Sequence, residues 1–286
     1  MSMMDQASNL RLLAESKNNQ EDKRLRQETI IVTSGKGGVG KSSLSLILAY
    51  ALARLNKRVL LVDANLQNPN LHILTNTDSQ QPLRSWLDEQ VPIEKSAIVE
   101  LGDGLDLLPN NAMAAERRYY VQEDGAVFMD LLRPLAGEYE FVILDTQTGL
   151  NQWNLNLIAR SDLSLVVSIS DPTSVIDTYM LIKAALPHIS QPNFQLVVNQ
   201  VIGEQTGLEA HQNLNLALEH FMNYQVELLS MVPFDQEVVK AGFEQRPVWE
   251  VTKSSRALCQ AEKMARMITD FKKEKSRLMS IREASL

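Results

Sequence analysis

A chain of 286 residues, of which 44% are hydrophobic, is long enough to bury the core of one large α/β domain with short tails. The net charge of -7 argues against a protein that mainly coats nucleic acid, because phosphate backbones are bound through a surplus of lysine and arginine. The sequence has a single cysteine, Cys259, and no secretory-signal pattern, so we expect a cytoplasmic protein. No apolar stretch approaches the roughly 18 residues of a membrane span, so any contact with a membrane is expected to be peripheral.

The first 28 residues are polar and charged, and they include the run KNNQEDKRLRQE, residues 17–28. Within them Ala7, Leu10, Leu13 and Ala14 recur at helical spacing. Residues 1–28 are therefore predicted to form a short N-terminal helix and a solvated linker.

Compact apolar runs without alternation follow from Thr29 onward, as is typical of strands buried on both faces in a parallel sheet. They are TIIVTS (29–34), RVLLVD (58–63), LDLLP (105–109), FVILD (141–145), LSLVVSIS (163–170), FQLVVNQV (194–201) and VELLSMVP (226–233). Helical patterns separate several of them, for example over 41–56. This alternation predicts a doubly wound α/β fold with right-handed crossovers over residues 29–252. Residues 253–286 predict one long helix ending in the basic run DFKKEKSR.

The stretch SGKGGVGKS, residues 34–42, is a glycine-rich loop between the first predicted strand and the first predicted helix. Its residues Gly35, Gly40, Lys41 and Ser42 satisfy G-x-x-x-x-G-K-[ST] in the strand–loop–helix context that this phosphate-binding motif needs. Glycines let backbone N–H groups surround phosphate oxygens, and the helix N-terminus adds its positive dipole. Lys41 is predicted to neutralise the β- and γ-phosphates, and Ser42 to bind Mg²⁺. The predicted nucleotide-binding loop is Gly35, Lys36, Gly37, Gly38, Val39, Gly40, Lys41, Ser42 and Ser43.

A second lysine, Lys36, does not belong to the general motif, and a second cation near Lys41 requires an anionic partner because like charges repel at short range. Here the sequence resembles a family: KGGVGKS is similar to the deviant Walker A motif of the MinD/ParA ATPases. The resemblance implies a P-loop NTPase fold with a mainly parallel sheet, ATP and Mg²⁺ as ligands, and a homodimer formed on ATP. It also implies that Lys36 reaches the nucleotide of the opposing subunit; the alternative is a lysine that faces solvent.

The segment VLLVDANLQNPNL resembles the first switch of that family, which has the pattern Asp-x-Asp. By this resemblance Asp63 serves the Mg²⁺ shell, but Asn65 stands where the family has the carboxylate that positions the attacking water. An amide cannot take a proton, so we expect nucleotide binding with slow or impaired hydrolysis. The alternative is that Asn65 still orients water, because phosphoryl transfer depends mainly on positioning and electrostatics.

The segment FVILDTQTGL resembles the second acidic motif of the family, in which Asp145 reaches Mg²⁺ through water. The family has small residues before the glycine, whereas this chain has Gln147 and Thr148. The resemblance further assigns the adenine to Asn199 and to the backbone of the turn at Pro233 and Asp235, which favours ATP over GTP. For Asn199 taken alone, an ordinary turn residue is the alternative reading.

Two further segments resemble the FlhG family (also called FleN or YlxH) of flagellar number and placement regulators. DQASNLR, residues 5–11, resembles its N-terminal DQAxxLR motif, and DPTSVIDTYMLIK, residues 171–183, resembles a second segment. The resemblance implies that Gln6 stimulates the SRP-type GTPase FlhF, with Asp5, Leu10 and Arg11 fixing the helix; the alternative is a frayed helix that caps the core. It also implies a membrane-targeting C-terminal helix, for which a solvated charged helix is the alternative.

The leading hypothesis is an ATP-dependent dimerising switch that controls flagellar number or placement, acting with an FlhF-type GTPase and with flagellar switch-complex proteins or a flagellar transcription regulator. A second hypothesis is a regulatory scaffold that binds ATP without hydrolysing it. The third is a ParA-like partitioning ATPase, which would bind DNA. DQASNLR argues against the third.

Overall fold

The structure, a computed structural model, describes residues 27–78, 83–111 and 124–283. The predicted partner residues Asp5, Gln6, Leu10 and Arg11 lie outside the described residues. In the described part, one sheet has the strand order β3-β4-β2-β5-β1-β6-β7-β8. Its strands are β1 (Glu28–Thr33), β2 (Val59–Ala64), β3 (Val99–Gly102), β4 (Leu105–Leu108), β5 (Phe141–Thr146), β6 (Leu163–Ile169), β7 (Phe194–Val201) and β8 (Glu227–Pro233).

All neighbouring strands of this sheet run parallel except β3, which pairs antiparallel with β4 at one edge. The central strand β1 lies between β5 and β6, and all six of its residues are buried. The predicted doubly wound, mainly parallel fold is confirmed. The sequence did not indicate β3, because an edge strand of four half-exposed residues carries no compact apolar run.

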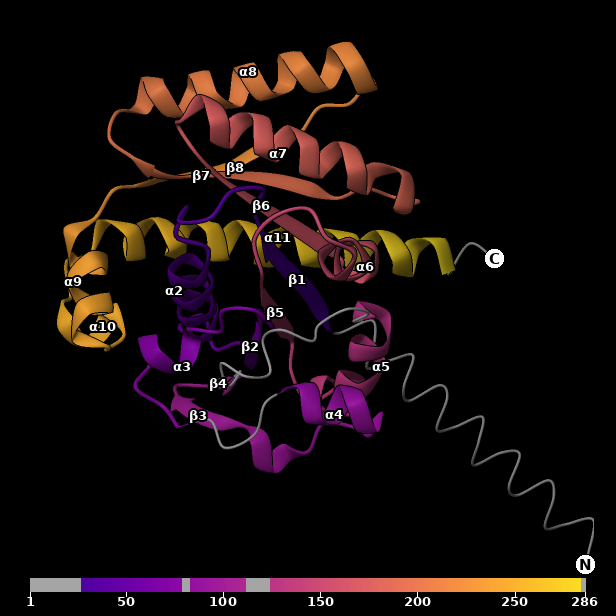
Figure 1. Ribbon diagram of the computed structural model, residues 1–286, viewed down its shortest axis with the longest axis vertical. Helices are drawn as coiled ribbons and strands as arrows, with labels where there is room; N and C mark the ends of the chain where they lie inside the picture. The colour runs from indigo at the N-terminus through magenta and orange to yellow at the C-terminus, as the bar shows by residue number, and fades with distance from the viewer. Residues whose placement is uncertain (1–26, 79–82, 112–123, 284–286) are drawn as a thin grey trace, which may run out of the picture.

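Helices cover both faces of the sheet (Figure 1), and each layer has its own hydrophobic core. One core contains residues of α2 (Lys41–Ala53), α3 (Leu71–Leu74), α9 (Gln236–Glu244), α10 (Val248–Val251) and α11 (Arg256–Glu283). The other contains residues of α4 (Leu83–Glu89), α5 (Gly125–Ala136), α6 (Gln152–Arg160), α7 (Pro172–Ala185) and α8 (Glu204–Met222). Two 3₁₀ turns complete the described elements, η1 (Lys95–Ala97) and η3 (Leu186–His188).

The long helix expected at the C-terminus is α11, which packs against α2 and β8. Its first half belongs to the core, since the apolar residues Ala261, Met264 and Ala265 are completely buried. Farther along, Phe271 is about half exposed. None of the helices in the described ranges is long and apolar enough to cross a membrane.

The parallel strands bring three loops to one edge of the sheet, because the carboxyl ends of parallel strands lie together. These loops follow β1 (residues 34–40), β2 (residues 65–70) and β5 (residues 147–151). The end of β7 meets the loop after β1 through a hydrogen bond from Asn199 to Val39, and the turn after β8 lines a cavity together with Gly40. The fold therefore collects the predicted site residues at one edge.

Candidate nucleotide site

The loop between β1 and α2 has a backbone that requires glycine at two positions. At Gly40 φ is 82°, in the left-handed region, and a Cβ there would lie 2.6 Å from Asn199 Nδ2. At Gly35 a Cβ would lie 2.3 Å from backbone atoms of Asp177. Among the described residues no side chain caps the N-terminus of α2, so its first N–H groups are open to an anion.

The lysine at the start of α2 is buried beside this loop. Lys41 Nζ donates a hydrogen bond to Thr148 Oγ1 at 3.0 Å. Burial lowers the pKa of Lys41, and the nearby charge of Asp145 partly offsets this effect. A cation held in a poorly solvated position attracts phosphate more strongly than an exposed one.

Two carboxyl groups lie on adjacent strands, where Asp63 of β2 is in register with Asp145 of β5. Both are fully buried, and burial raises the pKa of each; the charge of Asp145 raises the pKa of Asp63 further. Asp63 Oδ2 accepts hydrogen bonds from the backbone N–H groups of Asn70 and Leu71, at 3.0 and 2.9 Å. Two carboxyl groups so close together favour a bound cation between them and the phosphates.

One acceptor of this pair is unsatisfied. Asp145 Oδ1 accepts a hydrogen bond from Ser45 Oγ at 3.1 Å, whereas its Oδ2 is buried and has no hydrogen-bond partner among the described residues. A buried carboxylate oxygen without a partner fits the shell of Mg²⁺, which prefers oxygen ligands and retains several waters. The residues that would hold Mg²⁺ are Ser42, Asp63 and Asp145, and the ion would neutralise charge on the phosphates.

Two cavities adjoin at this edge and share Gly40 and Ser43. A cavity of about 360 Å³ is lined by the phosphate loop, the loop after β2, and Gln147 and Thr148. We call it the phosphate cavity. A cavity of about 210 Å³, the base cavity, is lined by Asn199, the β8–α9 turn and α9. A nucleotide that spans both would place its base and its phosphates where the sequence predicted.

The three residues expected at the base line the base cavity, and one of them also holds the phosphate loop. Asn199 lines the base cavity, and its Nδ2 donates to Val39 O at 2.8 Å. The carboxylate of Asp235 caps α9 by accepting from Glu237 N, and it also accepts from Ser255 Oγ. Asp235 therefore joins β8, α9 and the start of α11, while Pro233 contributes to the cavity wall.

The side chain of Asn65 is bound within its own loop. Its Oδ1 accepts from Asn68 N at 3.0 Å, and its Nδ2 donates to Asn68 O at 2.8 Å. Both polar atoms of the amide are therefore engaged by the backbone. In this arrangement Asn65 shapes the loop after β2.

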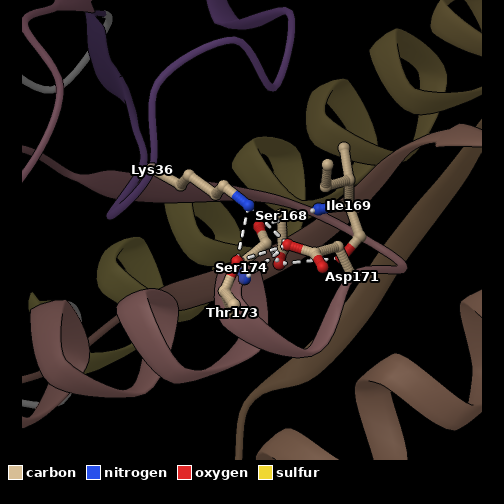
Figure 2. A network of polar contacts seen from close by, with 6 residues as sticks. All are labelled: Lys36, Ser168, Ile169, Asp171, Thr173 and Ser174. Carbon is tan, nitrogen blue, oxygen red and sulfur yellow. Dashed lines mark hydrogen bonds and ion pairs between the residues drawn. The ribbon is translucent and has the colours of Figure 1, made fainter.

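The first lysine of the loop, Lys36, has an anionic partner in its own chain. Figure 2 shows its Nζ between Asp171 and Thr173 at the start of α7, at 2.5 Å from Asp171 Oδ2 and from Thr173 Oγ1. The hydrogen bond from Lys36 lowers the pKa of Asp171 to about 2. The two side chains are about one-third exposed, so the pair lies at the surface of the site.

Contacts that the sequence did not indicate hold the loop after β5. Asn154 Nδ2 donates to the carbonyl oxygens of Gln147 and Gly149, both at 2.8 Å. Asn151 caps α6, and its Nδ2 donates to Gly149 O. The only signal in the sequence is the abundance of asparagine in LNQWNLN, residues 150–156.

The family profile described as AAA domain matches residues 27–190. This chain belongs to that family, and it is a P-loop ATPase of the MinD/ParA type. The match covers β1 to α7, which includes the phosphate loop and both acidic strands. The general part of the sequence-based assignment is therefore established.

Two relatives and one solved structure illustrate the family. The chain is 26% identical over 230 residues to the antiactivator FleN of Pseudomonas aeruginosa, which covers 80% of this chain and 82% of FleN. It is 27% identical over 217 residues to the flagellum site-determining protein YlxH of Helicobacter pylori, which covers 74% and 72%. The septum site-determining protein MinD of Pyrococcus horikoshii, solved with Mg-ADP, superposes with a TM-score of 0.70 at 19% identity, over 85% of this chain and 96% of MinD.

Proposed function

We propose that this protein is an ATP-binding switch that dimerises on ATP, regulates flagellar number or placement, and hydrolyses ATP slowly. The observation that carries the proposal is the contrast between the two lysines of the phosphate loop. Lys41 is buried and lines the phosphate cavity, whereas the Lys36 side chain is 35% exposed and is bonded to Asp171 and Thr173. Exposed ion pairs are weak, so Lys36 is free to exchange Asp171 for the phosphates of a second subunit.

The loop after β5 is positioned to respond to nucleotide binding. Thr148 Oγ1 accepts from Lys41 Nζ, the atom that the β- and γ-phosphates need. Nucleotide binding must therefore break or share this bond, and the loop that carries Thr148 changes its contacts. Lys41 and the N-terminus of α2 bind the phosphates, while Ser42, Asp63 and Asp145 hold Mg²⁺. The dimer population follows from the difference in ATP affinity between monomer and dimer.

The flagellar role rests on relatives and on sequence. FleN is named an antiactivator and YlxH a flagellum site-determining protein. DQASNLR resembles the FlhG motif, so we propose that Gln6, with Asp5, Leu10 and Arg11, stimulates an FlhF-type GTPase. Flagellar switch-complex proteins or a flagellar transcription regulator are the further partners. We place the protein in the cytoplasm, with the end of the C-terminal segment 253–286 as the candidate for peripheral membrane contact or partner binding.

A second candidate function is a scaffold that binds ATP without turnover. The observation that favours it is the amide of Asn65, which is engaged by the backbone of Asn68 and provides no carboxylate for water. Steady-state ATP turnover separates the two functions. Turnover by the wild-type protein supports the cycling switch, and stable ATP-bound dimers without turnover support the scaffold.

Light scattering with Mg²⁺ and either ATP or ADP tests the switch. We expect the wild type to dimerise on ATP, Lys36→Ala to bind ATP but stay monomeric, and Lys41→Ala to lose nucleotide binding. Lys95→Ala is the matched control, because Lys95 is an exposed lysine paired with Glu138 near the β3 edge of the sheet. Equal dimerisation by the wild type and Lys36→Ala would refute the role of Lys36 between subunits. A second assay measures GTP turnover by FlhF. The Gln6→Ala variant is expected to stimulate this turnover less than the wild type does.

A further inference from the structure

One residue that lines the phosphate cavity carries a buried polar atom without a hydrogen-bond partner among the described residues. This residue is Gln147, which lines the cavity together with Lys41 and Thr148. Gln147 is 5% exposed, and its Oε1 is buried with no hydrogen-bond partner among the described residues. Leaving an acceptor buried and unpaired costs free energy, so such a group is expected where a ligand or water completes the site.

The orientation of the Gln147 amide is fixed by its neighbours. Its Nε2 donates to Asn151 Oδ1 at 3.1 Å. The amide of Asn151 is itself oriented by the backbone, because its Oδ1 accepts from Asn154 N and its Nδ2 donates to Gly149 O. Gln147 must therefore present its N–H group to Asn151, which leaves Oε1 as the free end.

The backbone of Gln147 is fixed as well. Asn154 is completely buried and donates to the carbonyl oxygens of Gln147 and Gly149. Both the main chain and the side chain of Gln147 are thus held by residues at the start of α6. A group that orients a reactant needs this kind of support, since a small displacement lowers the rate strongly.

The position that the family resemblance assigns to the water-activating group does not offer a free acceptor. Both polar atoms of Asn65 are bonded to Asn68. Another free acceptor in this cavity is Asn70 Oδ1, on the loop after β2. Gln147 is favoured over Asn70 because it lies next to Thr148, which contacts the phosphate-binding amine of Lys41.

We propose that Gln147 is the water-positioning residue of ATP hydrolysis in this protein, an inference that rests on the turnover assumed in the proposed function. Gln147 Oε1 accepts a hydrogen bond from the attacking water. The water oxygen forms a bond to the γ-phosphorus, and the bond from the γ-phosphorus to the bridging oxygen breaks with its electron pair leaving on ADP. The water proton passes to a phosphate oxygen, because an amide cannot hold it. Slow turnover follows from positioning without a base.

The test measures ATP turnover together with the trapping of ADP by aluminium fluoride, which mimics the transferred phosphoryl group. Gln147→Ala and Gln147→Leu are expected to lower kcat about tenfold to a hundredfold with KM unchanged, as loss of positioning predicts. Both should bind ADP and a non-hydrolysable ATP analogue like the wild type, yet trap aluminium fluoride poorly. Gln147→Leu fills the volume of the side chain, so it keeps the test valid where the alanine variant is unstable.

Three comparisons decide the outcome. Gln152→Ala is the matched control, because Gln152 is an exposed glutamine at the start of α6 bonded to Asn156, and it should behave like the wild type. Turnover and trapping at the wild-type level in both Gln147 variants would overturn the assignment. A loss of turnover in Asn70→Ala, with none in the Gln147 variants, would also overturn it. A wild-type protein that neither turns over ATP nor traps aluminium fluoride would overturn the hydrolytic cycle itself.

Discussion

The buried side-chain amide of Asn154 holds the loop after β5, so removing it is expected to lower the free energy of unfolding. Asn154→Ala deletes two hydrogen bonds, to Gln147 O and Gly149 O. Gln147 O is then left unpaired in a buried position, which costs about 1–3 kcal/mol, whereas the half-buried Gly149 O keeps its hydrogen bond from Asn151 Nδ2. Removing Asn154 Oδ1, which has no partner among the described residues, returns part of this cost. The expected loss in the free energy of unfolding is about 1–3 kcal/mol.

Urea unfolding measures this loss. With a denaturant slope of about 3 kcal/mol/M, the midpoint is expected to fall by roughly 0.3–1 M. Asn156→Ala is the control, because the hydrogen bonds of Asn156 lie in exposed surroundings and its substitution should change stability by at most about 0.5 kcal/mol. If Asn154→Ala unfolds at the same urea concentration as Asn156→Ala, the reasoning about the buried amide is wrong.

Two further predictions concern the phosphate loop and the opposite end of β1. Gly40→Ala should destabilise the fold by about 1–2 kcal/mol and prevent nucleotide binding, because Gly40 has a left-handed φ and the Cβ of an alanine would approach Asn199 Nδ2. Wild-type affinity of this variant in a nucleotide titration would contradict the prediction. Glu28→Gln should raise the thermal midpoint at pH 7, because burial raises the pKa of Glu28 above its ordinary 4.5 and its ionised form therefore opposes folding. That gain should disappear as the pH falls through the raised pKa toward 4.5, and a gain that persists below pH 4.5 would count against the argument.

The fold was predictable from the sequence because its strands are buried on both faces. Every residue of β2 and of β5 is buried, and such strands read as continuous apolar runs. The four-residue strand β3 escaped prediction because only an edge of the sheet requires it. The phosphate loop and the two acidic strand ends were also predictable, since strand, motif and helix are contiguous in the sequence.

The contacts within the site were not predictable, because they join residues far apart in the chain. Asp171 meets Lys36 across 135 positions, and nothing near Lys36 in the sequence identifies this partner. Gln147 appeared in the sequence only as a departure from the family pattern. Its free acceptor becomes visible once Asn151 and Asn154 are placed around it.

Helix α11 runs from the side of α9 and α10 to the opposite side of the molecule (Figure 1). Its 28 residues extend over about 42 Å. Near the start of the helix Ala257 lines the base cavity. Near its end Lys275 Nζ lies 3.7 Å from Glu28 Oε1, where the described chain enters β1. Because Ala257 and Lys275 belong to the same helix, a displacement of α11 at the base cavity would also move Lys275 beside the start of β1.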